Sequence, residues 1–119
     1  MVIIIAEEKN FENKIKKWLK DHGCWYVKYW SDGRFTQNGI PDILACVGGF
    51  LVGIEVKASN GKPSDLQLYN IRSIRKSGGY AWVVYPSGWE ILQAFLINIS
   101  SGLIFPMSLM DESEKEILK

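Results

Sequence analysis

Two apolar runs joined by a pair of glycines constrain the fold of this 119-residue chain more than any other feature. The runs occupy residues 42–47 and 50–57, and Gly48 and Gly49 stand between them. Both central positions of a type I′ turn need a positive φ, so adjacent glycines between apolar runs predict a tight β-hairpin. Hydrophobicity that is almost continuous along both runs predicts strands covered on both faces, as in a central sheet packed between helices.

The rest of the chain alternates between helical and strand patterns. The predicted elements are helices over 7–22 and 64–77, strands over 25–30 and 80–85, a turn at 86–88, a short helix or strand over 89–97, and an acidic tail over 111–119 that could form a helix. The second helix begins with the capping-box pattern Ser64-Asp65-Leu66-Gln67. This order predicts a mixed α/β fold, with a central mixed β-sheet flanked by helices.

Composition is that of an ordinary globular domain, with 47% hydrophobic and 23% charged residues, and the length suits one domain. The apolar run 2–6 has no basic flank and is far too short to span a bilayer. We therefore expect neither a signal peptide nor a membrane partner. Two cysteines without CxxC spacing indicate a reduced protein of the cytoplasm.

The formal net charge of +1 gives no global reason to expect a nucleic-acid partner. That balance is uneven along the chain, however. Residues 9–76 hold 12 Lys and Arg against 6 Asp and Glu, and the remainder holds 2 against 7. Near-neutrality therefore conceals a basic segment, which contains the predicted hairpin, and an acidic remainder.

The open end of the hairpin carries the candidate chemistry. With a two-residue turn, Asp42 falls opposite Glu55, where Cβ atoms are about 4.5–5.5 Å apart, and Lys57 projects from the same face as Glu55. Two adjacent carboxylates repel unless a cation lies between them. Mg²⁺ suits such a pair because it takes a few carboxylate oxygens and keeps waters and phosphate oxygens. The arrangement predicts metal-assisted phosphodiester hydrolysis, with Lys57 orienting the water or stabilising developing charge.

A structural reading of the same residues stays open. Asp42 could simply begin a strand after Pro41, Glu55 and Lys57 could be solvated edge residues, and a diagonal Asp42–Lys57 ion pair would be ordinary. Charges in a covered strand need partners, and here they interrupt an apolar hairpin only at its open end. That placement favours a site.

At these residues the sequence resembles the PD-(D/E)xK nuclease superfamily. Pro41-Asp42 matches the PD element, and Glu55-Val56-Lys57 matches the (D/E)xK element. Gly39-Ile40-Pro41-Asp42 looks like the G-x-P-D form of the VRR-NUC family, and Ser64 and Gln67 resemble the S-x-x-Q that begins its next helix. Gly78-Gly79 and the strand after it resemble the closing strand of that family. The resemblance covers residues 7–86.

This resemblance implies a restriction-endonuclease-like core over 7–86 in a single nuclease domain, 1–119. Residues 87–119 would be a C-terminal extension with a role in dimerisation or substrate choice. It implies a stand-alone, phage-type VRR-NUC endonuclease, similar to Holliday junction resolvases, working in the cytoplasm of a bacterial host. Such proteins use Mg²⁺ or Mn²⁺ and act as homodimers on branched DNA.

Residue by residue, the resemblance implies that Asp42 and Glu55 are metal ligands, with the Val56 carbonyl as a possible third, and that Lys57 is the catalytic lysine. Glu12 would be an outer or additional metal ligand, and Gln67 would help to position the site or the DNA backbone. Both have a simpler reading: acids near a helix start favour its dipole, and Gln67 could only cap Ser64. The candidate DNA contacts are Lys14, Lys17, Arg34, Lys62 and Ser64.

Two other functions stay open from the sequence. A related PD-(D/E)xK nuclease could cut flap or ordinary duplex DNA instead of four-way junctions. A DNA-binding module with the same fold could lack activity, although Asp42, Glu55 and Lys57 are all present.

Overall fold

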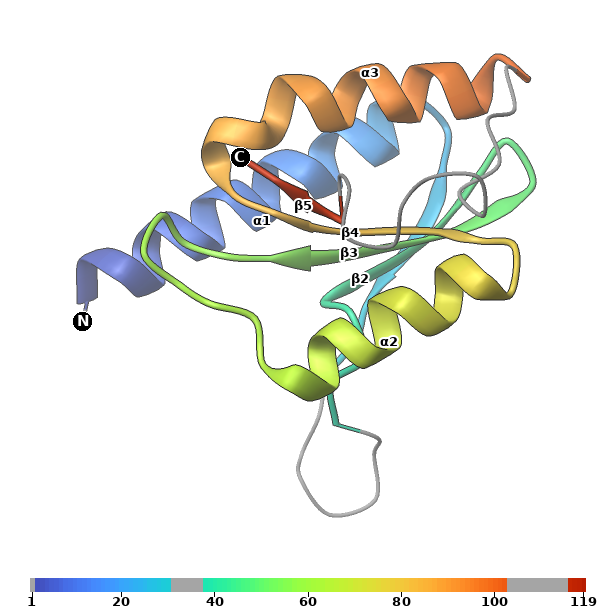
Figure 1. The fold of residues 1–119 in the computed structure, drawn as a ribbon. Coiled ribbons are helices and arrows are strands. Elements are labelled where there is room, and N and C mark those ends of the chain that lie inside the picture. Colours follow the sequence, from blue (N-terminus) through green and yellow to red (C-terminus); the bar gives the residue numbers. More distant parts are fainter. Residues whose placement is uncertain (1, 31–37, 103–115) are drawn as a thin grey trace.

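The computed structural model describes residues 2–30, 38–102 and 116–119, with side chains from residue 6 onward. Within these residues the chain forms a five-stranded mixed sheet and three α-helices. In chain order the elements are α1 (Val2–Asp21), β1 (Trp25–Lys28), β2 (Ile43–Val47), β3 (Phe50–Val56), α2 (Asp65–Lys76), β4 (Tyr80–Val84), the 3-10 helix η1 (Pro86–Gly88), α3 (Trp89–Ser100) and β5 (Ile117–Leu118). Helices α1 and α3 cover one face of the sheet, and α2 covers the other (Figure 1). The mixed α/β architecture is as predicted.

The predicted hairpin forms the middle of the sheet. Gly48 and Gly49 have φ values of 58° and 86°, and Val47 pairs with Phe50, so the two-residue turn is confirmed. A Cβ on Gly48 would lie 2.4 Å from the carbonyl oxygen of Ile99, because the turn packs against the end of α3. Glycine is thus required at this position by backbone conformation and by the close approach of a helix.

The strand order follows the chain, β1-β2-β3-β4-β5. Strands β1, β2 and β3 pair antiparallel, whereas β3 with β4 and β4 with β5 pair parallel. Helix α2 makes the crossover between the parallel strands β3 and β4, as a parallel pair requires. Lys57 extends β3 by one bond, since its N–H donates to the Val84 carbonyl at 3.0 Å. The end of β3 that carries the candidate site is therefore held on both sides.

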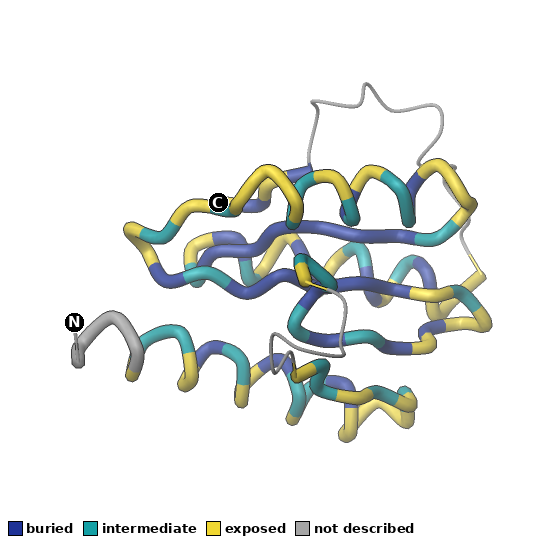
Figure 2. The backbone as a smooth tube through the Cα atoms, turned by 90° about the horizontal axis from the view of Figure 1, so that it is seen from below, coloured by how far each residue is buried: buried dark blue, intermediate teal, exposed yellow. Residues whose placement is uncertain are grey.

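Two hydrophobic layers hold the helices on the sheet. The larger layer lies under α1 and α3 and contains Phe11, Ile15, Leu19, Leu92, Leu96 and Ile99 with the inward residues of the strands. The smaller one lies under α2 and contains Ile71, Ala81, Val83 and Tyr85. All five residues of β4 are buried, as expected for an inner strand with helices on both faces of the sheet (Figure 2).

The helices leave part of one face of the sheet uncovered near β1. Trp25 pairs with Cys46, which pairs with Leu51, so the three side chains form a row across β1, β2 and β3. All three are exposed, Trp25 at 65% and Leu51 at 49%. The expectation that helices cover both faces therefore holds for the β3–β4 centre and is wrong for this part of the sheet.

The ends of several elements differ from the sequence predictions. Helix α1 begins at Val2 rather than at residue 7, so the apolar run near the start is part of a helix. The segment that fitted a helix or a strand is the helix α3. No helix in the described parts of the chain is long and apolar enough to cross a membrane.

The last residues of the chain form strand β5 rather than a helix, which corrects the prediction for that end of the tail. The free edge of β4 explains the difference: the N–H groups of Val83 and Tyr85 donate to the carbonyls of Glu116 and Leu118, at 2.7 and 2.9 Å. Residues 111–115 of the predicted tail lie outside the described residues.

Candidate active site

The two hairpin carboxylates meet at the open end of β2 and β3. Asp42 stands one residue before β2, and its Oδ2 accepts a hydrogen bond from the Val56 N–H at 2.8 Å. Its carboxyl group is also hydrogen-bonded to that of Glu55. The juxtaposition of Asp42 with Glu55 is therefore as the hairpin register predicts.

Glu55 is 2% exposed, and its environment opposes ionisation. Burial, the hydrogen bond to Asp42 and the charge of Asp42 together raise the pKa of Glu55 to about 9, although Lys57 opposes this shift. At neutral pH the buried Glu55 carboxyl group therefore favours its protonated form. A bound cation would replace that proton.

Lys57 lies beside this pair. Its Nζ is 3.6 Å from Glu55 Oε2, and the side chain is 15% exposed. The prediction that Lys57 shares a face with Glu55 is confirmed by this contact. An ammonium group this close to the Glu55 carboxyl group and still partly open to solvent can reach a ligand bound beside Glu55.

Glu12 joins the site through a lysine that the sequence analysis did not single out. Lys28, the last residue of β1, places its Nζ 2.5 Å from Glu12 Oε1 and 3.3 Å from Asp42 Oδ1. The other oxygen of Glu12 lies 3.0 Å from the Nζ of Lys16. Glu12 therefore lies near Asp42 with both of its oxygens paired to lysines.

Lys28 could not be found from the sequence because the pairing of β1 with β2 was unknown. Residues 29–42 separate the two strands, and no tight turn fixes their register. The register observed pairs Lys28 with Ile43, and the Tyr29 N–H donates to the Asp42 carbonyl at 2.8 Å. Lys28 therefore lies on the face of Ile43, which α1 covers, and its side chain reaches both Glu12 of α1 and the Asp42 carboxylate.

The simpler reading of Glu12, a favourable interaction with the helix dipole, is wrong. Because α1 begins at Val2, its first turn contains no acidic residue, and Glu12 lies in the middle of the helix. Glu8, one turn earlier, also faces the site: it interacts electrostatically with Asp42, Lys57 and Lys28. Burial and then the charge of Asp42 raise the pKa of Glu8.

Gln67 and Ser64 form the predicted capping box at the start of α2. The Gln67 N–H donates to Ser64 Oγ at 3.1 Å, and the Ser64 N–H donates to Gln67 Oε1 at 2.8 Å. The capping role of both residues is confirmed. Their roles in positioning the site and in contacting DNA stay predictions.

The candidate DNA contacts lie on two elements beside the site. Lys14 and Lys17 are exposed on α1, where Lys17 forms an ion pair with Asp21 at 2.7 Å. Lys62 and Ser64 are exposed on the segment between β3 and α2. Arg34 lies outside the described residues.

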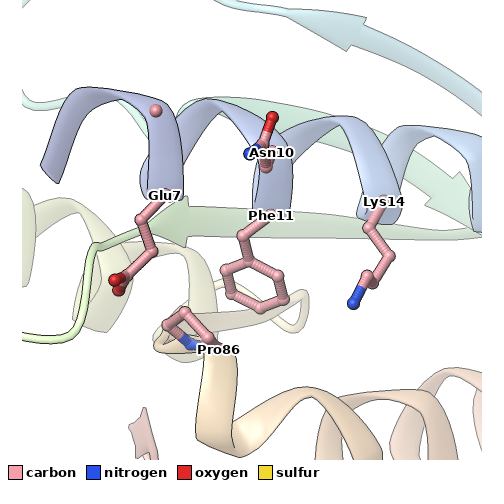
Figure 3. A pocket seen from close by; sticks show the side chains of 6 residues that line it. Glu7, Asn10, Phe11, Lys14 and Pro86 are labelled. Carbon is pink, nitrogen blue, oxygen red and sulfur yellow. The ribbon is translucent and has the colours of Figure 1, made fainter. Parts of the chain in front are cut away.

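Lys14 also lines a groove of about 500 Å³ between α1 and η1. Figure 3 shows Glu7, Phe11 and Lys14 projecting from α1 toward Pro86. Glu7 and Lys14 give the groove one charge of each sign over a largely apolar lining, so the groove has no clear preference for an anion.

The residues at the hairpin end fit a hard divalent cation. No group of three or more His, Cys, Asp or Glu residues that could hold a metal was found within the described residues. Mg²⁺ does not require such a group, because it binds through one or two carboxylates and keeps several waters. Asp42, Glu55 and the neighbouring Val56 carbonyl offer only oxygen ligands, which such a cation prefers.

A mixed sheet that gathers an Asp, a Glu and a Lys at the open end of its central hairpin has the arrangement of the PD-(D/E)xK class of nucleases. The family model described as archaeal Holliday junction resolvase (hjc) matches residues 6–108. Because the match spans most of the chain, the protein belongs to the Hjc family, a PD-(D/E)xK-type nuclease family whose resolvases are endonucleases that bind junction DNA. No curated protein and no solved structure matches the chain.

Proposed function

We propose that this chain is a Mg²⁺- or Mn²⁺-dependent endonuclease that hydrolyses phosphodiester bonds in four-way DNA junctions, and that it acts as a homodimer. The observation that carries the proposal is the cluster of Asp42, Glu55 and Lys57, in which the buried Glu55 carboxyl group interacts with Asp42 and lies 3.6 Å from Lys57 Nζ. Membership of the Hjc family supports the junction as substrate. The proposed core is restriction-endonuclease-like, in a single domain over 1–119.

In the proposed mechanism Asp42, Glu55 and the Val56 carbonyl would hold the ion. When bound, it lowers the pKa of a coordinated water and neutralises phosphate charge. The Lys57 ammonium donates a hydrogen bond to the attacking water or to a phosphoryl oxygen, which stabilises charge that develops in the transition state. Gln67 would help to orient the segment that follows Lys57.

Lys28 and Glu12 form the outer part of the proposed site. Lys28 lies between the carboxylates of Glu12 and Asp42, so it limits repulsion between them. An ion held by Asp42 would weaken the attraction of that carboxylate for the Lys28 ammonium, and Lys28 could then contact a DNA phosphate. Glu12 would then be an additional ligand or would keep Lys28 in place.

The proposed dimer is supported by the uncovered apolar row of Trp25, Cys46 and Leu51 on the sheet. Exposed apolar groups that lie side by side indicate an interaction surface. A twofold dimer would place two sites across one junction, which a monomer cannot do. Sedimentation should give twice the monomer mass at working concentration, and a monomer would contradict paired cleavage.

Finer features of the sequence support a more specific proposal. The G-x-P-D form at Gly39-Ile40-Pro41-Asp42 is similar to that of stand-alone, phage-type VRR-NUC proteins. The proposed setting is therefore phage DNA in the cytoplasm of a bacterial host. For residues 87–119 we propose a role in dimerisation or in substrate choice.

Cleavage assays on three labelled substrates, a four-way junction, a flap and a linear duplex, test this function. In Mg²⁺ the wild-type protein should cut the junction preferentially, EDTA should stop cleavage, and Lys57→Ala should reduce it by about 10²-fold or more. Lys20→Ala, which removes an exposed lysine of α1, is the matched control.

The other possible results lead to different functions. Cleavage confined to the flap or the linear duplex would keep the chemistry and remove junction selectivity. Junction binding without cleavage in either Mg²⁺ or Mn²⁺ would indicate a non-catalytic DNA-binding module. Cleavage that is undiminished in Lys57→Ala or in EDTA would contradict the mechanism.

A further inference from the structure

Two adjacent glutamates of α1 hold the backbone that directly follows Lys57. Glu7 Oε1 accepts hydrogen bonds from the Ser59 N–H and from Ser59 Oγ, both at 2.5 Å. The Ala58 N–H lies toward the Glu8 carboxylate and lowers the pKa of Glu8. Consecutive acids thus bind consecutive residues of a segment about fifty positions further along the chain. We call these contacts the Glu7–Glu8 clamp.

The clamp connects a rigid element to a segment that has left the sheet. Helix α1 is fixed by Ile15 and Leu19, which are fully buried in the core. Strand β3 ends at Val56, and the next residue in a regular element is Asp65. Between these points the segment is also held by the Tyr85 hydroxyl, which donates to the Gly61 carbonyl at 2.7 Å.

The helix dipole of α1 does not explain why acidic residues occur at positions 7 and 8. Both lie beyond the first turn of α1, so the helix dipole does not favour them there. Glu8 moreover lies among the charges of the site, since it interacts with Asp42, Lys57 and Lys28. A carboxylate that faces other carboxylates is unfavourable in itself, and the Ala58 N–H offsets only part of that cost.

We propose that Glu7 and Glu8 are positioning residues, which direct the Lys57 ammonium toward the Asp42–Glu55 pair by fixing the backbone of Ala58 and Ser59. This inference rests on the proposed nuclease function for its catalytic part. The geometry supports it because Ala58 is the immediate neighbour of Lys57, and a shift of its amide changes the direction in which the lysine side chain leaves the backbone. A misplacement of about 1 Å at a reacting group can cost 10²-fold in rate.

The test compares alanine and glutamine at each position. Glutamine keeps an Oε1 acceptor for the amide and removes the charge, whereas alanine removes both. Glu8→Ala should accelerate amide hydrogen exchange at Ala58 by about 10-fold or more, and Glu7→Ala should do so at Ser59, because each amide loses its partner. In junction cleavage kcat should fall about 10- to 100-fold with KM little changed. Glu90→Ala, an exposed glutamate of α3, is the control.

The glutamine variants separate positioning from charge. Glu7→Gln and Glu8→Gln should retain slow exchange and most of kcat. Unchanged exchange in both alanine variants would overturn the clamp. Exchange at Ala58 could stay slow in Glu8→Gln while kcat falls as far as it does in Glu8→Ala. That result would overturn positioning and indicate a role for the charge of Glu8. A wild-type protein that cuts no DNA would overturn the proposed function and the catalytic part of this inference, while the exchange rates would still show whether the clamp exists.

Discussion

At the scale of single residues, the site is a cluster of acids and lysines at the open end of the hairpin. Glu8, Glu12, Asp42 and Glu55 face three lysines, and the most buried of the four acids keeps its proton. Asp42, Glu55 and Lys57 could be predicted to meet because one short turn fixes their register. Lys28 and Glu8 could not, since they come from elements whose placement depends on the whole fold.

Glu55 gives the protein a characteristic dependence of stability on pH. Its pKa is about 9 in the folded protein and about 4.5 in the unfolded chain, so the folded state binds the proton more tightly. The stabilisation is complete below about pH 4.5 and is lost as pH rises toward about 9. Without metal, thermal unfolding should therefore occur at lower temperature as pH rises through this window.

Glu55→Gln provides the control for this prediction, since an amide does not titrate. The variant should show a weaker pH dependence in metal-free thermal unfolding and should be more stable than the wild type at pH 8. Added Mg²⁺ should stabilise the wild type increasingly with pH, because ion and proton compete for the same carboxylate. A wild-type profile as flat as that of Glu55→Gln would contradict the assignment.

Lys28 should matter for activity more than its place on an edge strand suggests. Lys28→Ala leaves Glu12 and Asp42 without the cation between them, and we expect junction cleavage to fall by about 10- to 100-fold. Lys28→Arg keeps the charge and should retain a larger share of the activity. Initial cleavage rates at saturating Mg²⁺ test this. Rates equal to the wild type in Lys28→Ala would show that the lysine is only structural.

At the scale of elements, the β2–β3 hairpin was the most predictable part of the fold. Its two glycines, its apolar runs and its register all follow from local chemistry. The secondary structure of the last residues was not predictable, because β5 forms by pairing with the edge of β4. Local sequence patterns predicted the type of an element where turn residues determine it, as in the hairpin. Elements such as β5 depend on tertiary contacts.

The hairpin turn offers a matched pair of substitutions. Gly48→Ala and Gly49→Ala both place a side chain at positive φ, which costs about 1–3 kcal/mol in each case. Only at Gly48 would the new Cβ meet the Ile99 carbonyl, whereas Gly49 has open space. Gly48→Ala should therefore cost at least about 1 kcal/mol more in urea unfolding. Equal losses would show that α3 does not constrain the turn.

At the scale of the whole molecule, the ends of the chain support the site from a distance. Helix α1 carries Glu7 and Glu8 to the residues after Lys57, and β5 extends the sheet at the edge of β4, where Tyr85 donates to Leu118. Glu116 is buried and accepts two hydrogen bonds from Arg72 of α2, at 2.7 and 3.0 Å. Contacts between residues so far apart in the chain cannot be predicted from local sequence patterns.

The Arg72–Glu116 ion pair should contribute to the stability of the fold although it is not part of the candidate site. Arg72→Ala leaves a buried carboxylate without its two charged hydrogen bonds, and we expect a loss of about 1–3 kcal/mol in the free energy of unfolding. Arg72→Lys keeps the charge without the paired geometry and should lose less. Urea unfolding measures both, and a neutral Arg72→Ala would contradict the proposed anchoring of β5.

The central claim is that Asp42, Glu55 and Lys57 form a metal-dependent phosphodiesterase site on a junction-binding protein. Its most direct test measures binding and cleavage of one four-way junction by the wild type and by Asp42→Asn. Binding would be measured in Ca²⁺ and cleavage in Mg²⁺. We predict that Asp42→Asn binds the junction with an affinity within a few-fold of the wild type and cuts it at least about 10³-fold more slowly. Cleavage at the wild-type rate by Asp42→Asn would contradict the account.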